Sequence, residues 1–106
     1  MKILFDQGTP APLRRVLGGH TVETAYERGW STLQNGELIA AAESAQFGVL
    51  VTTDKNVKYQ QNLAARSIAV VVLLTTSWAR IQQLLPPVIA AVNDAIPGSH
   101  FEVQGK

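Results

Sequence analysis

The sequence contains no cysteine among its 106 residues. This absence excludes a disulfide scaffold, a cysteine zinc site and a thiol nucleophile. It fits a reducing compartment, and we expect the protein to be cytoplasmic. Long apolar runs are also missing, because the longest, from Ile68 to Leu74, is far shorter than the ~20 residues that a membrane helix needs. No secretory signal follows Met1, so we expect no membrane partner.

The sequence also lacks a strong excess of positive or of negative charge. Lys and Arg together number 9, Asp and Glu together number 8, and the formal net charge is +1. This balance gives no general attraction to nucleic acid, so any such binding must come from a local patch. Hydrophobic residues make up 46% of the chain, which predicts a packed core. The length predicts one domain over residues 1–106.

Strand and helix patterns alternate along the chain. Short apolar runs predict strands, and apolar residues at helical spacing predict helices. Asn35 is the expected N-cap of the second helix, and Ser77 that of the last, which Pro86 and Pro87 must kink or split. Pro87 is suited to begin the second part of that helix. The expected strands are 2–5, 20–24, 49–53, 68–74 and a terminal edge strand at 100–104, and the expected helices are 11–17, 37–46, 55–65 and the segment from 78 onward.

This alternation predicts a three-layer α/β/α fold with a central, mostly parallel sheet. In such sheets, ligands bind beyond the carboxyl ends of the strands. Two acidic residues, Asp6 and Asp54, follow predicted strands, and Glu37 stands in the first turn of a predicted helix. The three carboxylates converge at the carboxyl edge if these strands are neighbours. Clustered carboxylates repel one another unless a cation lies between them, and Mg²⁺ or Mn²⁺ prefers such oxygen ligands.

Each of these acids also has a purely structural interpretation. Asp6 precedes Gly8 and Pro10, so it could cap a turn. Glu37 near a helix N-terminus is favoured by the helix dipole alone. Asp54 before Lys55 could form an Asx turn. The sequence pattern alone leaves both interpretations open.

A second feature is a basic stretch. Lys55, Lys58, Arg66 and Arg80 lie between residues 55 and 93, where there is no acidic residue. Cations bind phosphates, while tyrosine and amide side chains, as in residues 59–62, can stack on bases or form hydrogen bonds with them. The alternative is a solvated helix face.

Four segments resemble the small PIN-like proteins, a branch of the PIN nuclease superfamily. They are Met1-Lys-Ile-Leu-Phe-Asp6 followed by Pro10, Asn35-Gly-Glu37-Leu-Ile, Val49-Leu-Val-Thr-Thr-Asp54-Lys-Asn56, and Tyr59-Gln-Gln-Asn-Leu63 followed by Ile68-Ala-Val-Val-Val-Leu73. The resemblance covers about residues 1–95 in order. It implies a PIN-like fold and a metal-dependent ribonuclease, in many cases the toxin of a toxin–antitoxin pair.

The resemblance also implies roles for particular residues. Asp6, Glu37 and Asp54 would be the catalytic and metal-binding residues, with Mg²⁺ or Mn²⁺ as the cofactor. The hypothesis adds a set of substrate-binding residues that would hold the RNA: Thr52, Lys55, Asn56, Lys58 and Arg66.

The sequence departs from the family pattern at Gln7, Asn35 and Asn56, which are amides where acids are common. An amide oxygen can ligate Mg²⁺ but brings no negative charge.

The leading hypothesis is therefore a metal-dependent endoribonuclease. Its partners would be RNA, an antitoxin protein and a second copy of the chain. The alternative is a PIN-like module that binds RNA or a partner protein without cutting, which the three amides favour. A receiver-like signalling domain is a third interpretation, because Asp54 follows a central strand. The absence of an acidic pair after the first strand counts against it.

Overall fold

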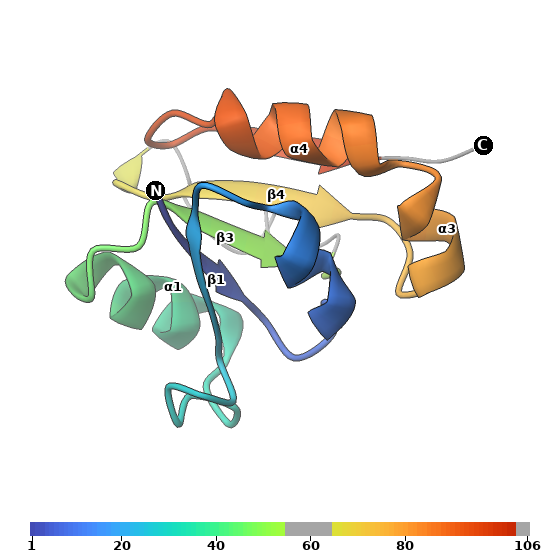
Figure 1. The fold of residues 1–106 in the computed structure, drawn as a ribbon. Helices are drawn as coiled ribbons and strands as arrows, with labels where there is room; N and C mark the ends of the chain where they lie inside the picture. Colours follow the sequence, from blue (N-terminus) through green and yellow to red (C-terminus); the bar gives the residue numbers. More distant parts are fainter. Residues whose placement is uncertain (55–64, 104–106) are drawn as a thin grey trace.

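A computed structural model describes residues 1–54 and 65–103 of the chain. A five-stranded sheet runs through its centre, and all its neighbouring strands are parallel (Figure 1). The strand order is β2-β1-β3-β4-β5. The strands are β1 (Lys2–Phe5), β2 (Thr21–Thr24), β3 (Val49–Thr52), β4 (Ala69–Leu73) and β5 (His100–Val103). The predicted parallel α/β sheet is confirmed, including its terminal edge strand.

Helices cover both faces of the sheet, which gives the predicted three layers. The 3₁₀ helix η1 (Ala11–Val16) and the helices α3 (Trp78–Gln82) and α4 (Leu85–Asn93) lie on one face. The helix α1 (Asn35–Ser44) lies on the other face, opposite α4 (Figure 1). No helix in the described part of the chain is long and apolar enough to cross a membrane.

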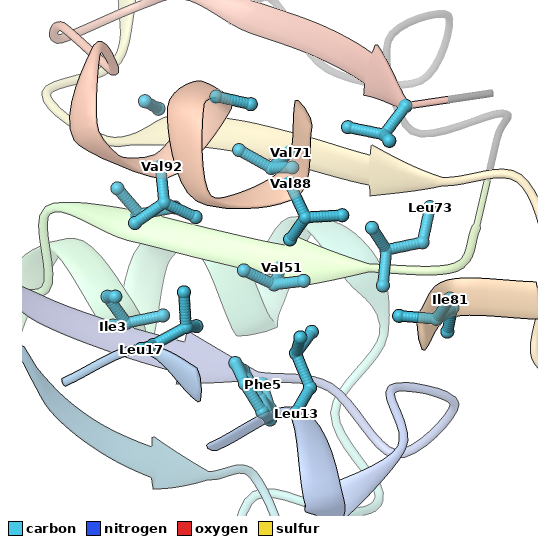
Figure 2. Packing of buried hydrophobic residues seen from close by; sticks show 14 residues of the cluster. Ile3, Phe5, Leu13, Leu17, Val51, Val71, Leu73, Ile81, Val88 and Val92 are labelled. Atoms are coloured by element: carbon cyan, nitrogen blue, oxygen red, sulfur yellow. The ribbon is translucent and has the colours of Figure 1, made fainter. Parts of the chain in front are cut away.

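Two hydrophobic clusters hold these layers together. Successive side chains of a strand point to opposite faces, so Val71 joins one cluster while Val70 and Val72 join the other. On the α4 face, Val71 packs beside Val88 and Val92 (Figure 2). All residues of β3 and β4 are buried, as expected for central parallel strands with helices on both faces.

The helix α1 begins and ends earlier than the sequence predicts. Its N-cap is Gln34 rather than Asn35, because Gln34 and Glu37 form a reciprocal capping box. At the other end, Gln46 adopts a positive φ of 66°. The N–H of Phe47 then bonds to the carbonyl of Ala42, and that of Gln46 bonds to the carbonyl of Glu43. This Schellman arrangement ends the helix at Ser44.

The last helical segment is split, as predicted, and Ser77 caps its first part. The break falls at Gln83 and Leu84, and the second helix begins at Leu85 rather than at Pro87. Pro86 stands at the second position of α4, where its missing N–H is not needed. The predicted helix over 55–65 lies almost wholly outside the described residues.

Candidate functional site

The strand order places the carboxyl ends of β1 and β3 at a topological switch point. The chain passes from β1 to β2 on one side, and β3 then pairs with β1 on the other side. Ligand sites in doubly wound sheets form at such points. Asp6 follows β1 there, and its backbone N–H donates to the carbonyl of Val51 at 3.1 Å. The sequence-predicted Asp6 therefore stands where this fold places ligands.

The carboxylate of Asp6 accepts several hydrogen bonds from the chain. Its Oδ1 accepts from the backbone N–H of Gly8 at 3.1 Å. The hydroxyl of Thr9 lies 2.8 Å from the same oxygen and 2.9 Å from the carbonyl of Val51, so it donates to one of the two. Its Oδ2 accepts from the hydroxyl of Thr52. These contacts fix the orientation of a half-buried carboxylate.

Thr52 joins the two acidic residues of this edge. It is the last residue of β3, and its side chain is 1% exposed. Its hydroxyl donates to Asp6 and accepts from the backbone N–H of Asp54 at 3.1 Å. The sequence predicted Thr52 as a substrate-binding residue. The structure places its buried hydroxyl in hydrogen bonds with the carboxylate of Asp6 and the backbone N–H of Asp54.

The turn after Asp6 approaches the end of β3 closely. A Cβ atom added to Gly8 would lie 2.2 Å from the hydroxyl oxygen of Thr53 and 3.8 Å from Oδ1 of Asp6. Only a residue without a side chain fits this contact in the observed conformation. The signal was visible in the sequence as a glycine two residues after Asp6.

Glu37 stands in the first turn of α1, as predicted, where its carboxylate takes part in the helix cap. Its Oε1 accepts a hydrogen bond from the backbone N–H of Gln34 at 3.1 Å. Within residues 1–54 and 65–103, no three His, Cys, Asp or Glu side chains are grouped as a metal ion would require. Asp6, Glu37 and Asp54 thus do not form such a group in this structure. The amide of Gln7 donates to the carbonyl of Ser31 at 2.7 Å.

Arg66 lies away from the carboxyl edge. It precedes β4, and therefore stands at the amino edge of the sheet, where its guanidinium bonds to Glu43 in the last turn of α1 at 2.8 Å. Glu43 also accepts from the backbone N–H of Ser67 at 2.6 Å. Burial acts to raise the pKa of Glu43, but the bonds from Ser67 and Arg66 outweigh it and lower that pKa. Arg66 thus joins a helix to a strand, and it does not meet Asp6.

The other predicted substrate-binding residues, Lys55, Asn56 and Lys58, lie outside the described residues.

Sequence reasoning missed a cationic cavity beside the carboxyl end of β2. It has a volume of about 450 Å³ and is lined by Ala11, Pro12, Arg14, Arg15, Thr24 and Glu27. The guanidinium of Arg14 forms an ion pair with Glu27. This hydrogen-bonded pair, together with the backbone N–H of Thr24, lowers the pKa of Glu27. The adjacent arginines were visible in the sequence, but only the tertiary structure places them beside the end of β2.

Comparison with protein-family models, with curated proteins and with solved structures finds no match to this chain. The fold and the edge described above define a small doubly wound α/β domain with Asp6 and Asp54 at its switch point.

Proposed function

We propose that the protein is a Mg²⁺- or Mn²⁺-dependent endoribonuclease that hydrolyses RNA phosphodiesters. We propose further that it acts as the toxin of a toxin–antitoxin pair. The observation that carries the proposal is the position of Asp6 at the β1–β3 switch point, linked through Thr52 to Asp54. The resemblance of four ordered segments to PIN-like proteins supports the choice of reaction and of RNA as the substrate.

The donor atoms of this edge suit a hard divalent cation. Mg²⁺ commonly binds through one or two carboxylates and keeps several waters, so Asp6 and Asp54 would be enough to hold one. An ionised carboxylate has about four acceptor positions, and the hydrogen bonds described above use three of those on Asp6 at most. When bound, such an ion activates water and stabilises the charge that develops on a phosphoryl group.

The residues around Asp6 would contribute orientation and substrate binding. The backbone N–H of Gly8 and the hydroxyl of Thr52 hold the carboxylate of Asp6 in one direction, which reduces the reorganisation needed when a cation binds. Arg14 and Arg15 line the cavity beside the end of β2. These two arginines would bind the phosphates of the RNA, a role that the sequence analysis gave to Arg66.

The second candidate is a PIN-like module that binds RNA or a partner protein without cutting. The position of Glu37 favours it, because this carboxylate is engaged in the cap of α1. The amides at Gln7, Asn35 and Asn56 favour it too, since they add no negative charge for a cation.

Mn²⁺ titration and RNA cleavage would distinguish the two candidates. A nuclease should degrade a mixed RNA pool with Mn²⁺ and stop when a chelator is added. Asp6→Asn and Asp54→Asn should each lower the rate at least about a hundredfold and weaken Mn²⁺ binding. The matched control is Asp94→Asn, which makes the same change at the end of α4 and should keep the full rate.

RNA affinity gives an independent measurement. Arg15→Gln should weaken RNA binding and flatten its salt dependence, because fewer counterions are released. Arg66→Gln should leave the affinity unchanged. Metal-independent degradation that is equal for the wild type and Asp54→Asn would identify a contaminant and reject the nuclease. RNA binding without degradation would support the second candidate.

A further inference from the structure

The cavity beside the carboxyl end of β2 lies between two segments of the chain. Arg14 and Arg15 belong to η1, the 3₁₀ helix that follows the turn after β1. Thr24 ends β2, and Glu27 stands in the turn after it. The last residue of β2 pairs with the last residue of β1. The cavity therefore lies at the same edge of the sheet as the candidate site.

Arg14 is held by Glu27 but is not fully satisfied by it. Its Nη1 donates to Oε2 of Glu27 at 3.3 Å, and its Nη2 donates to Oε1. A guanidinium has more N–H donors than one carboxylate accepts. The Nε of Arg14 is buried and has no hydrogen-bond partner among the described residues, which is rare for a buried donor. Arg14 thus retains donors for an acceptor larger than a carboxylate.

The described residues that line the cavity carry more positive than negative charge. Arg14 and Arg15 are adjacent, and Glu27 is the acidic residue among them. Arg15 is exposed, and it forms no ion pair with a carboxylate of residues 1–54 or 65–103. An anion that enters the cavity therefore meets a guanidinium that Glu27 does not neutralise, and it is attracted there.

The carboxylate of Glu27 can leave Arg14 without opening the turn to which it belongs. Its side chain is 49% exposed, and exposed ion pairs contribute little to stability. The turn is also held by the backbone. The N–H of Glu27 donates to the hydroxyl of Thr24 at 3.0 Å, and the N–H of Arg28 donates to the carbonyl of Thr24 at 3.1 Å. An anion that competes for Arg14 therefore displaces only a side chain.

We propose that this cavity binds a terminal phosphate group, which replaces Glu27 on Arg14 and also bonds to Arg15. A terminal phosphate carries a charge of about −1.5 to −2 at pH 7 and has several acceptor oxygens, enough for both guanidinium groups. Arginine presents its donors as a planar fork that suits phosphate, and such charge-assisted hydrogen bonds are strong. The inference goes beyond the proposed function and rests on it only for the carrier of the phosphate, an end of an RNA chain.

Competition with Glu27 makes the cavity selective for chain ends. An internal phosphate of RNA carries a single negative charge, as the carboxylate of Glu27 does, so the exchange of one for the other gains little. A terminal phosphate brings additional charge and a further oxygen, and it bonds to Arg15 as well. The same RNA should therefore bind more tightly when its end is phosphorylated.

The binding of short, internally labelled RNA in the presence of a chelator tests this preference without any cleavage. The RNAs share one sequence and differ only at their ends, with hydroxyls at both ends, a phosphate at the 5′ end or a phosphate at the 3′ end. A phosphorylated RNA should bind at least about fivefold more tightly than the hydroxyl-ended RNA, and inorganic phosphate should remove the difference. The RNA that binds more tightly identifies the end. Equal affinities for all of them would overturn the proposal.

Substitution of the arginine tests where the phosphate binds. Arg14→Gln should remove the preference for a phosphorylated end. Arg66→Gln is the matched control, because it also breaks an arginine–glutamate pair but lies at the amino edge of the sheet, and it should keep the preference. A preference that survives in Arg14→Gln would place the phosphate elsewhere and reject the site.

Substitution of the competing acid should have the opposite effect. Glu27→Gln removes the negative charge and keeps an oxygen that can accept from the N–H of Thr24, so it should tighten the binding of inorganic phosphate about threefold. The matched control is Glu23→Gln, which removes an acid of β2 that pairs with Arg28 instead, and it should change nothing. No gain in Glu27→Gln, or an equal gain in both variants, would reject the competition. This test leaves Arg14 in place and does not depend on the folding of an arginine variant.

The outcome is independent of catalysis, because every binding measurement is made without a metal ion. Asp6→Asn should keep the preference for a phosphorylated end even where it abolishes cleavage. A nuclease that binds all ends equally would refute the terminal-phosphate site alone. A protein that keeps the preference but cleaves no RNA would refute the nuclease alone.

Discussion

The hydroxyl of Thr52 donates a hydrogen bond to the carboxylate of Asp6, which joins the carboxyl ends of β3 and β1. Thr52 is nearly inaccessible to solvent, so water cannot replace this donor without a structural change. The same hydroxyl accepts the backbone N–H of Asp54. One buried side chain thus contacts both acidic residues of the candidate site, the carboxylate of Asp6 and the backbone of Asp54.

We expect Thr52→Val to destabilise the protein by about 1.5 to 3 kcal/mol, because Asp6 loses a donor and the N–H of Asp54 loses an acceptor. Urea unfolding at pH 7 measures the change. Thr52→Ser keeps the hydroxyl and is the control, and its loss should be smaller. A valine variant as stable as the wild type would show that the hydrogen bond contributes nothing.

Gly8→Ala should destabilise the turn after Asp6 by about 1 kcal/mol, because the new methyl group would press on the side chain of Thr53. Adding Thr53→Ala should restore most of the loss, while Thr53→Ala alone should change little. A double-mutant cycle in urea gives the coupling between the two positions. Additive effects would show that the destabilisation by Gly8→Ala does not come from the contact with Thr53.

Two substitutions of Glu37 distinguish a helix-capping role of its carboxylate from a metal-binding role. Glu37→Gln should keep the stability of the protein, because glutamine also completes a capping box, whereas Glu37→Ala should lower it by about 1 kcal/mol. Thermal unfolding measures both. If Glu37→Gln leaves the stability intact but abolishes Mn²⁺-dependent RNA cleavage, its carboxylate serves the reaction as well as the helix.

The Glu43–Arg66 pair should make stability depend on pH. The pKa of Glu43 lies below its ordinary value of 4.5, so its contribution is fully present above that pH and is lost as the pH falls through the folded pKa. Because the pair is partly exposed, Glu43→Gln should cost at most about 1 kcal/mol at pH 7, and progressively less as the pH falls through the folded pKa of Glu43.

Urea midpoints from pH 7 to pH 2 test this dependence. The control is Glu27→Gln, which removes the carboxylate of a more exposed ion pair and should have a smaller effect at neutral pH. A Glu43→Gln deficit that is constant with pH would contradict the assignment.

Val71→Asp should abolish folding, because it places a charge without a partner between the sheet and α4. Ile96→Asp is the control, since Ile96 is 65% exposed and should accept the charge. Circular dichroism and one-dimensional NMR report whether each variant folds. A folded Val71→Asp variant would show that this face of the sheet is less tightly packed than the structure indicates.

The sequence by itself determined the strands and the class of the fold. Runs such as Val70–Leu73 have no polar residue, so they can be stable only when both faces are covered, and alternation with helices then implies parallel pairing. It also determined that Asp6 and Asp54 lie at one edge, because residues that follow parallel strands share the carboxyl end of the sheet. The sequence did not determine which residue caps α1, since Gln34 and Asn35 are both able to precede a helix. The hydrogen bond from the backbone N–H of Gln34 to the carboxylate of Glu37 selects Gln34.

The tertiary structure alone decided which of the predicted residues meet. The spacing of Asp6, Glu37 and Arg66 along the chain does not tell which side-chain contacts each will make. The capping box holds the carboxylate of Glu37, Glu43 holds Arg66 at the amino edge, and strand order sets Thr52 beside Asp6. The place of β5 beside β4, at the end of the strand order, is likewise a property of the tertiary structure. Such contacts join residues that are far apart in the sequence, so local sequence patterns do not predict them.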